Sequence, residues 1–298
     1  MARATTTRAA RVVAASVAEH LLSDAVTRLL AVAGDRATAR LEAELLLAHV
    51  LGVERLALLS RDVLDDGAAQ RFSTLVDRRA RTAEPIAHLI GRRGFWDIDL
   101  VSDGRALVPR PETELLVERC EALIEQGGLP TGPIIDWGTG TGALALVLAR
   151  HRPVVALDRM EAALSLAATN RARIPTAQRV WLLASRGMGC LRPGSAALIV
   201  ANPPYVTPAE WAELMPDVRE HDPHSALVPE HGDVLDLYVE LGAEAARVLV
   251  PGGRLLVEIG AGQADELEHG LASAGLEPAG RHRDLAGIER VLELRRAV

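Results

Sequence analysis

The chain has 298 residues and contains no lysine, since all 33 of its basic residues are arginine. The missing lysine excludes the phosphate-binding P-loop, which needs that side chain. Cys120 and Cys190 are the only cysteines, too few for a disulfide framework or a cysteine-based zinc site, and the nine histidines show no metal-ligand spacing. No apolar run approaches the roughly 20 residues of a membrane-spanning helix. The 40 acidic residues leave a net charge of −7, which disfavours bulk binding to nucleic acid or anionic lipid.

The rest of the composition, 49% hydrophobic and 24% charged, is that of a folded protein. We expect residues 1–16, rich in arginine and threonine, to form a disordered tail rather than a targeting segment, and the protein to be a cytoplasmic monomer. Residues 17–84 show helical spacing of apolar side chains with breaks at Gly34 and Gly52. Thr38 is the expected cap of the second helix, and Asp65 or Asp66 starts the third. The pattern predicts a small all-helical domain.

Residues 85–110 are predicted to be a linker with a β-hairpin that turns at residues 102–104. A helix over 112–124 follows Pro111, and strand and helix signals then alternate. The expected strands are 133–136, 154–158, 180–183, 197–201 and 254–259. Continuous apolar strands of this kind are typical of parallel sheets covered on both faces. Residues 111–298 are therefore predicted to form an α/β domain with a doubly wound, mostly parallel sheet.

A glycine-rich turn follows the first of these strands. Gly138, Gly140 and Gly142 come directly after Asp136 and Trp137 and before a helix over 143–149. Glycines let the backbone approach a ligand closely, and a helix N-terminus offers N–H groups to an anion. The spacing differs from the dinucleotide-binding fingerprint, which weakens a nicotinamide interpretation. A tight turn without a ligand is the alternative.

Asp158 ends the next strand, about 20 residues beyond the glycines, where an acidic side chain can accept hydrogen bonds from ribose hydroxyls. Taken alone, Asp158 has a second interpretation as the cap of a helix that begins near Met160. Together with the glycine turn, it indicates a cofactor that contains adenosine.

A third motif, Asn202-Pro203-Pro204-Tyr205, follows the apolar strand 197–201. Ligands of open α/β sheets bind beyond the carboxyl ends of the strands, so this motif is expected to face the same crevice as the glycine turn. The Asn202 side-chain oxygen and the Pro203 carbonyl oxygen can accept both hydrogens of an NH2 group, and Tyr205 offers a flat face to a planar amide or base. A rigid turn is the alternative interpretation.

In these three motifs the chain, from about residue 17 to its end, resembles the release factor glutamine methyltransferases (PrmC/HemK), a family of class I AdoMet-dependent methyltransferases. Further segments that carry the resemblance are 42–52, 84–86 with Gly91, Phe95 and Trp96, 108–114, 251–253, 258–260 with Gln263, and 284–287.

The resemblance implies a Rossmann-like methyltransferase domain that uses S-adenosyl-L-methionine, without a metal, to methylate the N5 of the glutamine in the Gly-Gly-Gln motif of class 1 peptide chain release factors. It also implies that the helical domain docks the body of the release factor. Asn202, Pro203, Pro204 and Tyr205 are expected to clamp the glutamine, and Asp158 to bind the ribose. The methionine and ribose portion is expected to contact Asp136, Gly138, Thr139, Gly140, Thr141 and Gly142.

Two positions near the expected site need separate interpretation. The family has an acidic residue after the third core strand, whereas this chain has Ser185 and Arg186 there; Ser185 is expected to accept a hydrogen bond from the adenine amino group. Arg110 stands between two prolines and is expected to shape the substrate site by pairing with Glu112, Asp136 or a ligand carboxylate.

Three alternative functions remain at this point. A DNA adenine-N6 methyltransferase is compatible with Asn-Pro-Pro-Tyr, but the negative net charge argues against it. A ribosomal-protein glutamine methyltransferase is disfavoured by the Pro-Arg-Pro-Glu-Thr-Glu sequence at 109–114. A non-catalytic AdoMet-binding relative is suggested by the missing acid near Ser185.

Overall fold

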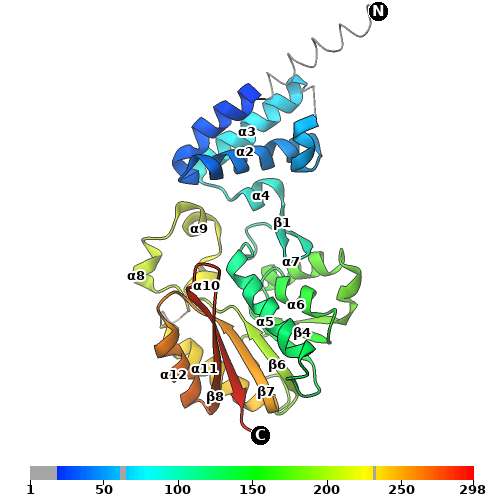
Figure 1. Ribbon diagram of the computed structural model, residues 1–298, viewed down its shortest axis with the longest axis vertical. Coiled ribbons are helices and arrows are strands. Elements are labelled where there is room, and N and C mark those ends of the chain that lie inside the picture. Colours follow the sequence, from blue (N-terminus) through cyan, green and yellow to red (C-terminus); the bar gives the residue numbers. More distant parts are fainter. Residues whose placement is uncertain (1–18, 61–64, 231–232) are drawn as a thin grey trace, which may run out of the picture. The chain divides into compact units, whose positions relative to one another are not determined.

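The computed structural model describes residues 19–60, 65–230 and 233–298 (Figure 1). The expected tail at 1–16 lies outside the described residues. The chain forms two compact units. The first is the chain up to Gly91 together with Met215–His221, and the second comprises Arg92–Leu214 and Asp222–Val298.

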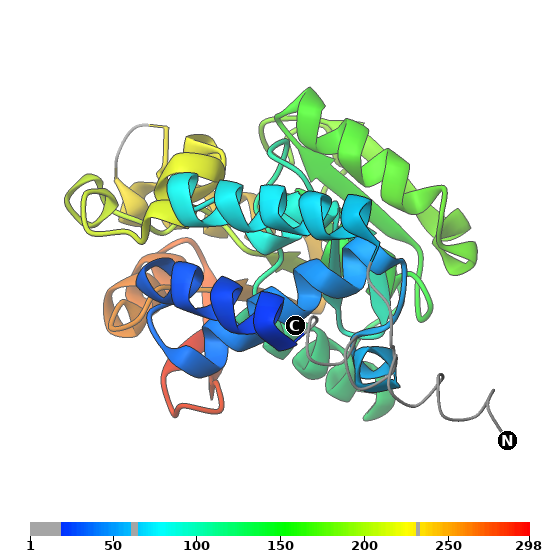
Figure 2. The ribbon, with the colours of Figure 1, turned by 90° about the horizontal axis from the view of Figure 1, so that it is seen from above.

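The first unit is helical. Residues 19–33 form a helix, and the following elements are α2 (Arg36–Leu51), the 3-10 helix η1 (Arg55–Ser60), α3 (Asp66–Thr82) and α4 (Ile86–Ile90). The helix over 19–33, α2 and α3, drawn as ribbons in Figure 2, bury a common apolar core that includes Leu29, Leu46 and Phe72. Chain reversals separate the helices at the predicted breaks, and Gly52 ends α2 with a left-handed φ of 63°.

The caps of these helices test the sequence prediction directly. Asp65 caps α3, as predicted, because its side chain accepts a hydrogen bond from the Ala68 N–H. The predicted Thr38 cap of α2 is wrong. Asp35 is the cap, since its carboxylate accepts the N–H groups of both Ala37 and Thr38 and so begins the helix earlier.

A β-hairpin opens the second unit. It consists of β1 (Arg92–Phe95) and β2 (Ile98–Val101), which pair antiparallel. The predicted hairpin is confirmed, and a turn does occur at residues 103–106, but it follows β2, because the two strands are joined at Trp96. Trp96 has a φ of 54°, and its N–H donates to Glu114 Oε1 over 2.9 Å, a contact 18 residues away in sequence that local turn signals cannot reveal.

The second unit is built on a seven-stranded sheet of order β5-β4-β3-β6-β7-β9-β8. Its strands are β3 (Ile134–Trp137), β4 (Val154–Asp158), β5 (Val180–Ala184), β6 (Ala196–Ala201), β7 (Leu249–Glu258), β8 (Leu276–Arg283) and β9 (Glu289–Arg296). The first five are mutually parallel where they pair. β9 is antiparallel to both β7 and β8. The predicted mostly parallel sheet is confirmed, and the antiparallel pair at its edge was not predicted.

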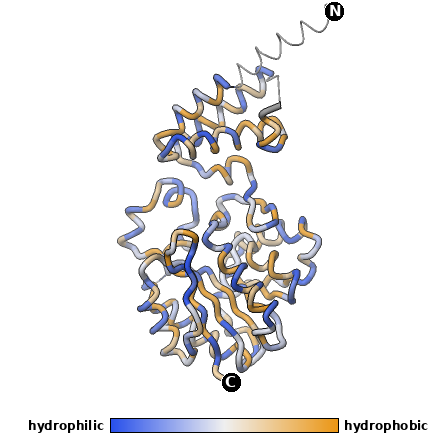
Figure 3. The backbone as a smooth tube through the Cα atoms, viewed as in Figure 1, coloured by the Kyte–Doolittle hydropathy of each residue, from blue (hydrophilic) through white to orange (hydrophobic). Residues whose placement is uncertain are grey.

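Helices cover both faces of this sheet (Figure 1). The helical elements are η2 (Pro111–Thr113), α5 (Glu114–Glu125), α6 (Ala143–Leu148), α7 (Glu161–Arg171), η3 (Pro175–Arg179), α8 (Pro208–Trp211), α10 (His224–Leu227), α11 (Val234–Val248) and α12 (Ala264–Ser273), with α9 (Pro216–His221) in the first unit. α5 and α6 share a core with one face, and α11 and α12 share a core with the other. The central strands are accordingly hydrophobic along their length (Figure 3). None of the described helices combines the length and the apolar character that crossing a membrane requires.

The parallel strands place several acidic and polar side chains at one edge of the sheet. Because β3, β4, β6 and β7 run in the same direction, the residues that end them or directly follow them lie at a common carboxyl edge. Asp158 and Glu258 end their strands, Asn202 directly follows β6, and Asp136 lies one residue before the end of β3.

Candidate active site

A cavity of about 460 Å³ opens at this carboxyl edge, within the second unit. Its size is that of a small-molecule site. Most of the site residues expected from the sequence line it: Arg110, Asp136, Gly138, Thr139, Gly140, Thr141, Asp158, Ser185, Asn202 and Pro204. Gly142, Pro203 and Tyr205 are not among the described lining residues.

Asp136 makes hydrogen bonds to the glycine turn and to the helix that follows it. Its side chain is 1% exposed, and Oδ2 accepts the Thr139 hydroxyl at 2.6 Å and the Ala145 N–H at 3.1 Å. Burial raises the pKa of this carboxyl to about 7, despite these hydrogen bonds. One N–H at the start of α6, which the sequence assigned to an anionic ligand, is therefore bonded to Asp136 instead.

Gly142 makes the turn from loop to helix possible. Its φ is 87°, and a Cβ at this position lies 3.1 Å from Leu146 Cδ1 and 3.3 Å from Ala167 Cβ. Both the backbone conformation and the close packing exclude a larger residue without strain. The role of Gly142 is thus to shape the turn whose preceding residues line the cavity.

The Asp158 carboxylate makes two contacts, one with the start of the next helix and one with the glycine turn. Oδ1 accepts the Met160 N–H at 2.8 Å, which is the local contact of a helix start. Oδ2 accepts the Gly140 N–H at 2.9 Å and so ties β4 to the glycine turn. Each carboxylate oxygen has a second lone pair, so both can still accept a ribose hydroxyl from the cavity.

Asn202 lines the cavity and has a side-chain acceptor that no described residue uses. Its Nδ2 donates to the Thr113 hydroxyl oxygen over 3.1 Å, whereas its buried Oδ1 has no hydrogen-bond partner among the described residues. A buried acceptor without a partner costs about 1–3 kcal/mol. The arrangement is therefore that of a site reserved for a donor that a ligand brings.

Comparison with known proteins is consistent with this geometry. The family model described as "PrmC N-terminal domain" matches residues 20–91, and the one described as "Methyltransferase small domain" matches residues 111–217. The chain is 39% identical over 283 residues to the release factor glutamine methyltransferase of Cereibacter sphaeroides, covering 93% of this chain and 98% of the relative.

The chain belongs to the release factor glutamine methyltransferase family. Two further members are similar over most of their length. That of Deinococcus radiodurans is 42% identical over 262 residues, covering 86% of this chain and 91% of the relative. That of Escherichia coli strain K12 is 37% identical over 280 residues, covering 92% and 96%.

In this member of the family, Glu258 is a site residue to which the sequence assigned no role. It ends β7, and its buried Oε2 has no hydrogen-bond partner among the described residues. Glu258 is 1% exposed, and burial raises its pKa to about 7. Burial also raises the pKa of Tyr205. The only sequence signal for Glu258 is an acidic residue at the end of an apolar strand.

The backbone of Tyr205 is fixed from the same strand end. Its carbonyl oxygen accepts the Gln263 Nε2–H at 3.0 Å, and Gln263 Oε1 accepts the Gly260 N–H at 2.9 Å. The segment that follows Asn202 is thus bound to the loop after β7. Gln263 does not line the cavity, but through these hydrogen bonds it holds the backbone of a residue next to the cavity in place.

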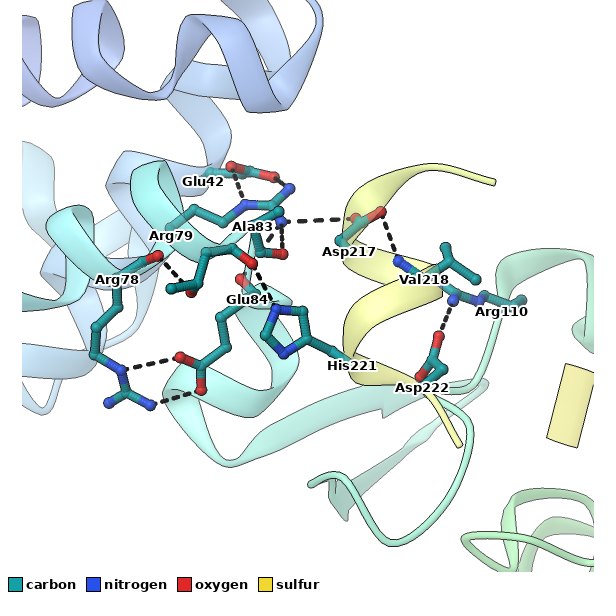
Figure 4. A network of polar contacts seen from close by, with 11 residues as sticks. Glu42, Arg78, Arg79, Ala83, Glu84, Arg110, Asp217, Val218, His221 and Asp222 are labelled. Carbon is teal, nitrogen blue, oxygen red and sulfur yellow. Dashed lines mark hydrogen bonds and ion pairs between the residues drawn. The ribbon is translucent and has the colours of Figure 1, made fainter. Parts of the chain in front are cut away.

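Arg110 pairs with a residue that the sequence did not suggest. Its Nη2 lies 2.5 Å from Asp222 Oδ2 (Figure 4), and Asp222 Oδ1 accepts the Val108 N–H at 3.2 Å. The Asp222 side chain is fully buried, whereas Arg110 is about one-third exposed and lines the cavity. The expected pairing with Glu112 or Asp136 is therefore wrong; the segment before α10 supplies the partner.

The segment just before Asp222 belongs to the helical unit. Asp217 of α9 lies 3.6 Å from Arg79 Nη1, and Arg79 also makes two hydrogen bonds to Glu42 (Figure 4). His221 Nε2 lies 2.6 Å from the Thr82 carbonyl oxygen. Residues far beyond the helical region in sequence therefore complete this unit.

The loop after β5 contains no acidic residue, but the fold brings one to it. The Glu244 carboxylate of α11 accepts the Met188 N–H at 2.9 Å and lines the cavity. The Ser185 hydroxyl donates to the Gly187 carbonyl oxygen over 2.6 Å, so its own oxygen can still accept. The loop itself has no acid, as the sequence indicates, and the distant Glu244 supplies a carboxylate at this end of the site.

Proposed function

We propose that the chain is an enzyme that transfers a methyl group from S-adenosyl-L-methionine to the side-chain amide nitrogen of the glutamine in the Gly-Gly-Gln motif of class 1 peptide chain release factors. The observation that carries the proposal is the buried, unpartnered Oδ1 of Asn202 at the cavity. The names of relatives 37–42% identical over most of the chain support the same reaction.

The residues at the cavity fit this methyl donor. The glycine turn lets the backbone approach a ligand, and Asp136 and Asp158 place two carboxylates beside it. When bound, S-adenosyl-L-methionine supplies an electrophilic methyl group. Asp136 and the residues from Gly138 to Thr141 would hold its methionine part, and Asp158 its ribose. Ser185 and Glu244 are the acceptors available to the adenine amino group.

An amide is a weak nucleophile, because its nitrogen lone pair is delocalised into the carbonyl group. Residues 202–205 would offset this weakness. Asn202 Oδ1 and the Pro203 carbonyl oxygen would accept the two N–H groups, which increases electron density on the nitrogen and turns it toward the methyl group. Catalysis is then mainly orientation of an in-line displacement at a preorganised polar site.

We further propose that the helical unit docks the body of the release factor and that the enzyme works as a cytoplasmic monomer without contacting nucleic acid. Leu41 of α2 is 43% exposed, and it is a suitable probe of this surface. Leu41→Asp should raise KM for the intact release factor and leave the rate with a Gly-Gly-Gln peptide unchanged. An equal effect on both substrates would contradict docking through this surface.

The reaction itself is tested by peptide mass spectrometry. Unmethylated release factor is incubated with the protein and S-adenosyl-L-methionine, with Asn202→Ala in parallel. One added methyl group on the Gly-Gly-Gln peptide, absent with the variant and absent when the motif glutamine is replaced by glutamate, is the expected result. No methylation by a protein that binds the methyl donor would refute the proposed substrate.

A further inference from the structure

An exocyclic NH2 group distinguishes adenine from hypoxanthine, the base of inosine, which has a carbonyl oxygen at the same position. A protein that selects adenine must place a hydrogen-bond acceptor opposite this group, because the same acceptor faces an oxygen when hypoxanthine is bound. Ser185 and Glu244 both line the cavity at the loop after β5. Their contacts show which of them is the better acceptor.

The Ser185 hydroxyl group already has partners for both its proton and its oxygen. It donates to the Gly187 carbonyl oxygen over 2.6 Å, and the Cys190 Sγ lies 3.5 Å from Ser185 Oγ as a donor. A hydrogen bond to a neutral oxygen is also about half as strong as one to an ionised carboxylate. Ser185 is therefore the weaker of the two acceptors.

Glu244 reaches the same loop from α11. Each of its two carboxylate oxygens lies 2.9 Å from the Met188 nitrogen, whose N–H they accept. Residues three and four apart on a helix share one face, and one such face of α11 lines the cavity with Leu237, Glu240, Leu241 and Glu244. The fold therefore places a carboxylate both at the cavity and against the backbone of the loop.

Gly187 provides the space for this carboxylate. A Cβ at position 187 would lie 2.6 Å from Glu244 Oε2 and 2.7 Å from Glu244 Oε1, far inside van der Waals contact. Gly187 is not among the residues with positive φ, so glycine is needed here for space and not for its backbone conformation. The Glu244 carboxylate thus occupies the volume in which a side chain of the loop would begin.

Arg247 of α11 holds the same loop from a second point. Its Nη2 donates to the Met188 carbonyl oxygen over 2.6 Å, and its Nη1 donates to the Leu191 carbonyl oxygen over 2.8 Å. Arg247 is not among the described residues that line the cavity. It therefore contributes to the position of the loop without offering a contact to a ligand, which makes it a natural control for Glu244.

We propose that Glu244 determines the base specificity of the methyl-donor site, because its carboxylate accepts a hydrogen bond from the adenine NH2 group in place of an acid in the loop. Two carboxylate oxygens offer about four lone-pair sites, so the Met188 N–H leaves acceptor capacity for a ligand. The proposal rests on the function proposed above and names the residue that recognises the base of the methyl donor.

Two ligands that differ at this group test the proposal. S-adenosylhomocysteine and S-inosylhomocysteine are titrated calorimetrically into the full chain, and the ratio of their Kd values measures the preference for adenine. Wild type should prefer S-adenosylhomocysteine about 10- to 100-fold, the effect of one hydrogen bond to a charged group. In Glu244→Gln the Met188 N–H binds the new side-chain oxygen, and the NH2 group faces the base. This group can donate to hypoxanthine but cannot accept from adenine, so the ratio should fall below about threefold.

Three further variants separate recognition of the base from the position of the loop. Gly187→Ala keeps the carboxylate but pushes it away from the loop, so the ratio should fall as in Glu244→Gln. Arg247→Gln is the matched control, because it loosens the loop without changing an acceptor at the cavity. Both Kd values should then rise by a similar factor, and the ratio should stay within about twofold of wild type. Ser185→Ala should also preserve the ratio, and circular dichroism checks that each variant is folded.

The outcomes distinguish this proposal from the proposed function. Equal binding of both ligands by wild type, a wild-type ratio in folded Glu244→Gln, or a ratio that is lost in Ser185→Ala instead would overturn the role of Glu244. The titrations need no release factor, so a protein that fails to methylate the Gly-Gly-Gln motif refutes the proposed substrate and still yields the ratio. A preference for adenine that is lost in Glu244→Gln and Gly187→Ala but kept in Arg247→Gln would establish the proposal.

Discussion

Replacing Asp136 by asparagine should stabilise the free protein and weaken cofactor binding. Burial raises the pKa of this carboxyl from 3.8 to about 7, so the folded state holds its proton more tightly than the unfolded state does. Between about pH 4 and 7 the folded protein binds more protons, and the free energy of unfolding therefore falls as pH rises. The full effect is on the order of 4 kcal/mol.

Asparagine carries no charge, but its Oδ1 can still accept from Thr139 and Ala145, which now bond to Asp136. Asp136→Asn should therefore raise the free energy of unfolding at pH 8 and remove most of the decline between pH 4 and 7. Urea denaturation at several pH values measures both effects. The matched control is Glu240→Gln, which removes an exposed carboxylate from the same cavity and should change stability little.

Cofactor affinity should respond in the opposite sense, because the ammonium group of the methionine part favours an ionised Asp136. With a pKa of about 7, only about one molecule in ten is ionised at pH 6, so the Kd for S-adenosylhomocysteine should be about tenfold weaker at pH 6 than at pH 8. Calorimetric titration of the wild type and Asp136→Asn measures this difference. A wild-type Kd that does not change with pH, or an Asp136→Asn variant that keeps wild-type affinity at pH 8, would refute the reasoning.

Three further predictions concern packing and exposure. Gly142→Ala should cost about 2–4 kcal/mol in urea denaturation, because both φ and close packing oppose a Cβ; Gly34→Ala, with a φ of 82° but no atom within 4 Å, should cost only about 1 kcal/mol, and equal costs would contradict the packing argument. Asp222→Ala should cost about 1–3 kcal/mol, since it leaves the Val108 N–H without its acceptor and a partly exposed Arg110 without its partner; unchanged denaturation would show that these contacts contribute nothing. Iodoacetamide should modify the exposed Cys190 in the native protein and spare Cys120, which is buried and has a raised thiol pKa; peptide mapping that finds Cys120 modified first would contradict this assignment.

Local patterns in the sequence predicted the central architecture because each depends on neighbouring residues. The strand expected at 154–158 is β4 to the residue. The glycine turn was evident because positive φ selects glycine, and the expected ligand edge followed from the rule that parallel strands end together. The edge pair β8 and β9 was not predicted, because much of β8 is exposed and lacks the continuous apolar run that marked the buried strands.

The sequence by itself determined which residue types stand at the ends of the strands, because strand periodicity and turn chemistry are local. Only the tertiary structure decided their partners. Thr113 lies 89 residues before Asn202, Asp222 lies 112 residues after Arg110, and Glu244 reaches a loop 56 residues before it. Such pairs are set by the order of strands in the sheet and by the helices packed on it.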